Sequence, residues 1–82
     1  MSEREIVSAE RLIEILNLEL SQREECAGCT FHGVLQKLDE PYADGGNWSR
    51  SIAIRGRPAN PDAAGHAAAD VIEILAMRFN LP

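Results

Sequence analysis

The chain has 82 residues, a mass of 9.0 kDa and a formal net charge of -5, which fit one small domain spanning residues 1–82. Hydrophobic residues make up 45% and charged residues 26%, the balance of a folded chain rather than a disordered one. No apolar run approaches the roughly 20 residues that cross a bilayer, and the acidic first residues are unlike a signal peptide. These features argue against a two-domain enzyme, a membrane protein and a secreted disulfide scaffold, and predict a cytoplasmic location.

The first predicted element is a helix from about Glu3 to Glu24. Ser2 and Glu5 have the spacing of a capping box, in which two side chains satisfy free backbone donors at a helix start. At about 100° per residue, one face of this helix is apolar: Ile6, Ala9, Leu12, Ile13, Leu16 and Leu20. A second apolar stripe lies on the opposite side of the helix beside Arg11 and consists of Val7, Ile15 and Leu18. These residues are either scattered exposed aliphatics or a contact surface.

The middle of the chain predicts two strands, and the end predicts a second helix. The strands cover Thr30–Leu38 and Trp48–Arg55, separated by a connection rich in turn formers at residues 39–47. Asn60 followed by Pro61 is a strong helix start, and the helix is expected to run to about Phe79. Its predicted buried stripe consists of Ala64, Ala68, Val71, Ile72, Leu75 and Phe79.

The predicted fold is therefore α+β, in the order α-β-β-α, with two helices packed on an antiparallel hairpin. A two-stranded hairpin is marginal in water and has two open edges, so we expect a homodimer that joins two hairpins into one four-stranded sheet. The small aliphatic core favours the same conclusion, because small domains often need a second subunit. The residues expected at the interface are Val7, Arg11, Ile15, Leu18 and Trp48.

Cys26, Cys29 and His32 form the one segment with a chemical motif, a C-x2-C-x2-H spacing. Two cysteines around a glycine-containing turn commonly supply half of a tetrahedral zinc site, with His32 as a third ligand. A fourth ligand is missing from the sequence pattern. The alternatives are buried structural thiols and a disulfide or redox pair. The redox interpretation is the poorer one, because the pair follows a helix end beside Glu24 and Glu25, which should raise the thiol pKa.

Arginines are concentrated in residues 48–60, where Arg50, Arg55 and Arg57 occur without an acid and give a local charge of +3. Such a segment could contact phosphate groups. The acidic chain as a whole would repel a polyanion, and no aromatic platform accompanies the arginines. Nucleic-acid binding is therefore a lesser alternative to pairing with the acidic first helix.

No catalytic constellation can be assembled from the sequence. His66, Asp70 and Glu73 recur at helical spacing and could hold a metal or act as acid and base, but a solvated helix face explains them equally well. We therefore expect a non-enzymatic interaction module, homodimeric, with an unknown protein partner and no cofactor. The alternative is a small zinc protein that uses Cys26, Cys29 and His32.

Overall fold

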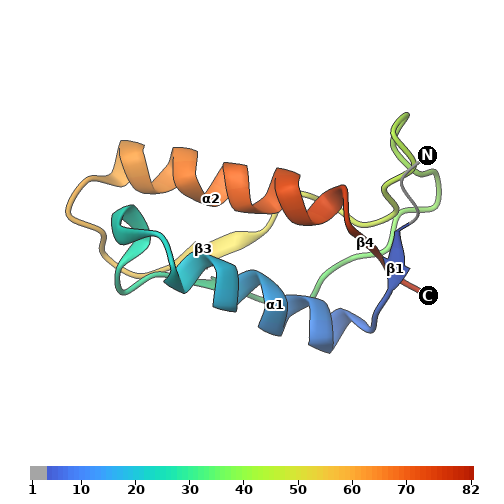
Figure 1. Cartoon of the computed structure of the whole chain (residues 1–82), viewed down its shortest axis with the longest axis horizontal. Helices are drawn as coiled ribbons and strands as arrows, with labels where there is room; N and C mark the ends of the chain where they lie inside the picture. The colour runs from blue at the N-terminus through green and yellow to red at the C-terminus, as the bar shows by residue number, and fades with distance from the viewer. Residues whose placement is uncertain (1–3) are drawn as a thin grey trace.

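Two helices and four short strands form the part of the chain that the computed structural model describes, residues 4–82. In chain order the elements are β1 (Glu5–Ile6), α1 (Ala9–Ser21), the 3-10 turn η1 (Glu24–Cys26), β2 (Thr30–His32), β3 (Ala53–Arg55), α2 (Pro61–Ala76) and β4 (Phe79–Asn80) (Figure 1). The protein is thus α+β, as predicted. None of the helices in residues 4–82 is long and apolar enough to span a bilayer.

The first helix begins six residues later than predicted, at Ala9. The Ser8 side chain caps it by accepting a hydrogen bond from the Arg11 backbone N–H at 3.1 Å. The segment before it is extended because β1 pairs in parallel with β4, with Glu5 opposite Phe79. The expected helix start at Ser2 and Glu3 lies outside the described residues.

The second helix has the start that the sequence predicts. Asn60 accepts a hydrogen bond from the Ala63 backbone N–H at 3.2 Å, and Pro61 occupies the first helical position. All six residues of its predicted stripe are buried. The helix ends at Ala76 rather than Phe79, because Phe79 belongs to β4 and pairs with β1.

The central hairpin is antiparallel, as expected, but its strands are shorter than the sequence pattern indicates. In β2 and β3, Phe31 lies opposite Ile54 and His32 opposite Ala53. Gly33 adopts a φ of +103°, which takes the chain out of the strand directly after β2. Beyond this point the two predicted strands meet only at an isolated bridge between Lys37 and Trp48.

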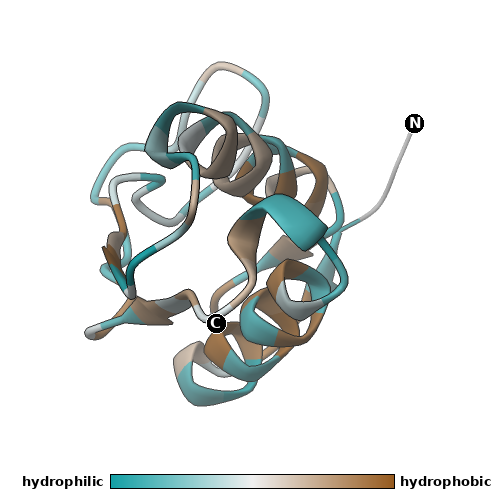
Figure 2. Ribbon diagram, turned by 90° about the vertical axis from the view of Figure 1, so that its left-hand side faces the viewer, coloured by the Kyte–Doolittle hydropathy of each residue, from teal (hydrophilic) through white to brown (hydrophobic). Residues whose placement is uncertain are grey.

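The observed order is β-α-β-β-α-β, so the predicted order α-β-β-α missed the two terminal strands. The helices run side by side in opposite directions, with the β1–β4 pair at one end (Figure 1). Viewed from the other end, the hairpin lies to one side of the helix pair (Figure 2). The core between them contains Leu12, Leu16 and Leu20 of α1, which are completely buried, together with Val71 and Leu75 of α2 and the aromatic residues Phe31, Trp48 and Phe79.

Candidate functional site

The two cysteines stand at the ends of a tight turn between η1 and β2. The Cys29 backbone N–H donates to the Cys26 carbonyl oxygen at 2.9 Å. Ala27 has φ -55° and ψ 125°, and Gly28 has φ +81°, which are the angles of a type II turn. Gly28 is therefore the left-handed residue of the turn, which holds the Cα atoms of the two cysteines close together.

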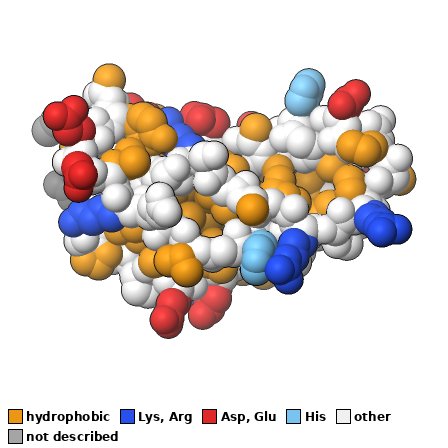
Figure 3. All heavy atoms as spheres, turned by 180° about the vertical axis from the view of Figure 1, so that it is seen from behind, with side chains coloured by type: hydrophobic (Ala, Val, Ile, Leu, Met, Phe, Trp, Pro, Cys, Tyr) orange, Lys and Arg blue, Asp and Glu red, His pale blue; other side chains and the backbone are white. Residues whose placement is uncertain are grey.

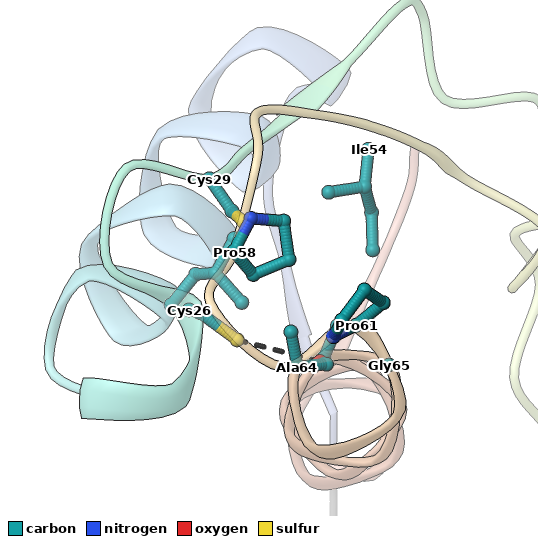
Figure 4. A pocket seen from close by; sticks show the side chains of 9 residues that line it. Cys26, Cys29, Ile54, Pro58, Pro61, Ala64 and Gly65 are labelled. Carbon is teal, nitrogen blue, oxygen red and sulfur yellow. Dashed lines mark hydrogen bonds between the residues drawn. The ribbon is translucent and has the colours of Figure 1, made fainter.

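Both thiols are free, and both line one apolar cavity of about 170 Å³. The cavity lies between the turn, the end of β3 and the first turns of α2 (Figure 4). Figure 3, seen from behind, shows hydrophobic side chains around a hollow on its right, at the end of the molecule where α2 begins. The cavity is lined by Leu20, Cys26, Cys29, Ile54, Pro58, Pro61, Ala64, Gly65 and Ala68.

Cys26 is the more deeply buried of the two cysteines, with 2% of its surface exposed, against 8% for Cys29. Its Sγ donates a hydrogen bond to the Ala64 carbonyl oxygen at 3.4 Å. Burial raises the pKa of the Cys26 thiol, and the charges of Cys29 and Glu25 raise it further, while Arg23 acts in the opposite direction. The protonated thiol is the form that can donate to Ala64, so Cys26 is a poor nucleophile at neutral pH.

Gly56 holds the loop after β3 against the cysteine turn. A Cβ atom at this position would clash with the Gly28 carbonyl oxygen and would lie 2.8 Å from the Cys29 Cα. Its φ of +126° is also in the range that favours glycine. The sequence shows Gly56 only as part of a loop, and a glycine directly after a strand was the one available signal for this close approach.

His32 lies apart from the cysteine cavity. It alternates with the buried Phe31 along β2, so its exposed side chain is on the other face of the hairpin, where it lines a separate hollow with Ser49 and Ser51. Across residues 4–82, no three His, Cys, Asp or Glu side chains are grouped to hold a metal ion. The predicted three-ligand site of Cys26, Cys29 and His32 is therefore not assembled in this structure.

The guanidinium of Arg50 is engaged by other side chains of the same chain, so it is not free to bind an anion. Its guanidinium donates to the two carboxylate oxygens of Asp44 at 2.7 and 3.0 Å and lies 4.3 Å from the centre of the Tyr42 ring. The hydrogen bond from Arg50 holds the pKa of the Asp44 carboxyl below its usual value, and the Gly46 backbone adds to this effect. Of the three arginines expected to contact anions, only Arg55 and Arg57 are exposed.

The acidic face expected on α2 is also engaged in ion pairs. Asp70 pairs with Arg23 at 3.0 Å, and Glu73 lies 3.7 Å from Arg50. His66 remains exposed beside them. This arrangement matches the alternative of a solvated helix face that the sequence left open.

Of the predicted interface residues, one belongs to the core and the others lie partly or fully at the surface. Trp48 is 1% exposed and donates from Nε1 to the Phe79 carbonyl at 2.9 Å, so it belongs to the core of the single chain. Val7 and Ile15 are partly buried against the same core. Leu18, at 62% exposed, and Arg11, which pairs with Glu14 at 3.2 Å, remain on the surface.

The two edges of the hairpin differ in a way that the sequence did not indicate. Asn17 of α1 reaches the outer edge of β2, where its Oδ1 accepts from the Phe31 backbone N–H at 2.7 Å and its Nδ2 donates to the Phe31 carbonyl at 3.4 Å. The side chain thus takes the place that a neighbouring strand would have. We call the opposite side, where β3 faces away from β2, the open β3 edge.

Comparison of the chain with protein-family models, with curated proteins and with solved structures finds no match.

Proposed function

We propose that this chain is a non-enzymatic interaction module that works as a homodimer, joined along the open β3 edge. The observation that carries the proposal is the contrast between the two hairpin edges. Asn17 occupies the β2 edge, whereas all three residues of β3 are exposed. An unpaired strand edge is a template for strand addition, and proteins that must avoid such pairing cover or charge it.

The hydrogen bonds of β2 indicate which groups β3 presents. Residue pairs in an antiparallel ladder alternate between hydrogen-bonded and non-hydrogen-bonded pairs. Because Phe31 directs both backbone groups to Asn17, the Phe31–Ile54 pair is of the non-hydrogen-bonded kind. The backbone N–H and C=O of Ile54 must then point outward, where they form the centre of the open β3 edge.

A second copy fits this edge about a two-fold axis at Ile54. Two β3 strands in antiparallel register would exchange both backbone hydrogen bonds between the two Ile54 residues. The Ile54 side chains, each 43% exposed in the single chain, would then lie opposite one another. The same register sets Arg55 across from Ala53 of the second copy, so the two arginines are not directly opposed.

The resulting sheet would contain four strands in the order β2-β3-β3-β2. An isolated two-stranded hairpin is marginal, and three or more strands with an apolar face give an independently stable sheet. Dimer formation would therefore stabilise the hairpin and cover the exposed Ile54 surface. The two other functions considered from the sequence have less support, because Arg50 is paired internally and His32 lies away from the thiols.

Sedimentation velocity at micromolar concentration tests the proposal. We expect the wild-type chain to be dimeric and Ile54→Pro to be monomeric, since proline removes the N–H that faces the open edge without removing a bond to β2. Ile54→Val keeps that N–H and a β-branched side chain, and should remain dimeric. Circular dichroism establishes that both variants fold. A wild-type chain that stays strictly monomeric, or a folded Ile54→Pro that still dimerises, would overturn the proposal.

A further inference from the structure

We infer that Cys26 and Cys29 form a two-thiolate binding site for cuprous ion in the apolar cavity between the cysteine turn and α2. This inference does not depend on the proposed dimer. It rests on the geometry of the turn, on the composition of the cavity and on the position of His32.

The turn holds the two cysteines close together without further movement of the backbone. The first and last Cα atoms of a β-turn lie within about 7 Å of each other. Gly28 supplies the left-handed residue, and the close approach of Gly56 supports the turn from the β3 side. Figure 4 shows Cys26 and Cys29 extending from this turn, with the Cys26 sulfur directed at Ala64 of α2, and both cysteines line the cavity.

The composition of the cavity selects a soft ion with a low coordination number. The two sulfurs are the only side-chain atoms with lone pairs among its lining residues, which are otherwise aliphatic, proline or glycine. Structural zinc requires four ligands, and calcium or magnesium requires several oxygens. Soft thiolate ligands suit cuprous ion, zinc and iron–sulfur clusters, and of these cuprous ion is the one that two sulfur ligands satisfy. With His32 on the other face of the hairpin, two thiolates are what the site offers.

Binding exchanges two S–H bonds for two copper–sulfur bonds and releases two protons. No electron is transferred, and the bound group carries one negative charge. The cavity borders Pro61 and Ala64 in the first turn of α2, where the helix dipole favours negative charge. Arg23 also favours the thiolate form of Cys26, although burial has the larger and opposite effect. Copper must therefore displace the Cys26 proton that bonds the Ala64 carbonyl.

Anaerobic titration of the reduced full chain with the cuprous bicinchoninate complex tests the inference. We expect the wild-type protein to remove one copper per chain from the chelator. Cys26→Ala and Cys29→Ala should each lose this transfer, and alanine leaves no unpaired polar group in the buried turn. The matched control is His32→Gln, which should bind copper as the wild type does, because His32 lies outside the cavity.

X-ray absorption at the copper edge supplies a second measurement on the unmodified chain, so the inference does not depend on the folding of a cysteine variant. Two sulfur scatterers and no nitrogen are expected. Loss of transfer in His32→Gln, a nitrogen ligand, or full transfer in folded Cys29→Ala would each overturn the inference. So would a wild-type chain that binds no copper, or one in which the thiols form only a disulfide.

Discussion

The bond between Asn17 and Phe31 provides a direct test of how the hairpin is organised. Asn17→Ala removes the acceptor that lies 2.7 Å from the Phe31 N–H and the weaker donor at 3.4 Å. A typical hydrogen bond contributes about 0.5–1.5 kcal/mol, and a buried backbone donor left without a partner costs about 1–3 kcal/mol. The better helix propensity of alanine offsets roughly 0.5 kcal/mol of this loss. We expect a net destabilisation of about 1–2 kcal/mol.

The assay is thermal or urea unfolding at one fixed protein concentration, because dimerisation would shift the apparent stability. For a domain of this size each kcal/mol corresponds to roughly 4–8 °C in Tm. Leu18→Ala is the matched control, since Leu18 is the next residue on the same helix and is 62% exposed. It should change the free energy of unfolding by less than about 0.5 kcal/mol.

Asn17→Ala also uncovers the second edge of the hairpin, so it should change assembly as well as stability. With both edges open, each chain can pair on two sides, and sedimentation should show species larger than the wild-type assembly. If Asn17→Ala is as stable as the wild type and assembles in the same way, Asn17 does not protect β2. The backbone groups of Ile54 would then not be assigned to the open β3 edge, and the proposed dimer would lose its main support.

Two further predictions concern the glycines and Asp44. Gly56→Ala should destabilise the chain by at least about 2 kcal/mol, because its φ of +126° and its contact with the cysteine turn both exclude a Cβ. Gly65→Ala, in open space on α2, should instead stabilise it by about 0.5–1 kcal/mol, and chemical denaturation that finds the same sign for both would contradict this reasoning. The pKa of Asp44 is lowered in the folded chain, so its contribution to stability is present above pH of about 4, the unfolded value, and is lost as pH falls through the folded pKa. Urea midpoints of wild type and Asp44→Asn should therefore differ at pH 7 and converge in acid, whereas a constant difference would exclude Asp44 as the titrating group.

The parts of the fold that the sequence predicts well are determined by neighbouring residues. The start of α2 follows from Asn60 and Pro61, and its buried stripe follows from helical periodicity. The type II turn is likewise local, since Gly28 stands where such a turn needs a left-handed residue. In each case the responsible side chains are close in the sequence to the structure that they specify.

The parts that were missed depend on contacts between distant residues. Two-residue strands such as β1 and β4 have no periodicity to detect, and they exist because Glu5 meets Phe79 across the length of the chain. Asn17 lies in a helix, where its residue type gives no sign that it pairs with β2. The capping pattern at Ser2 therefore predicted a helix over residues that β1 uses for pairing. Arg50, which looked like an anion contact, meets not only the nearby Asp44 but also Glu73 of α2, which is distant in the sequence.

Ile54 takes part in both proposed sites, but through different groups. Its backbone N–H and C=O form the open β3 edge, whereas its side chain lines the cysteine cavity. A second copy paired at this edge would place its own Ile54 side chain beside that cavity, one strand spacing of about 4.8 Å away. Ile54→Pro therefore tests the edge and leaves both thiols in place, and Cys29→Ala tests the thiols and leaves the edge intact. Because the two variants alter different groups, failure of the dimer would not count against the copper site, and failure of the copper site would not count against the dimer.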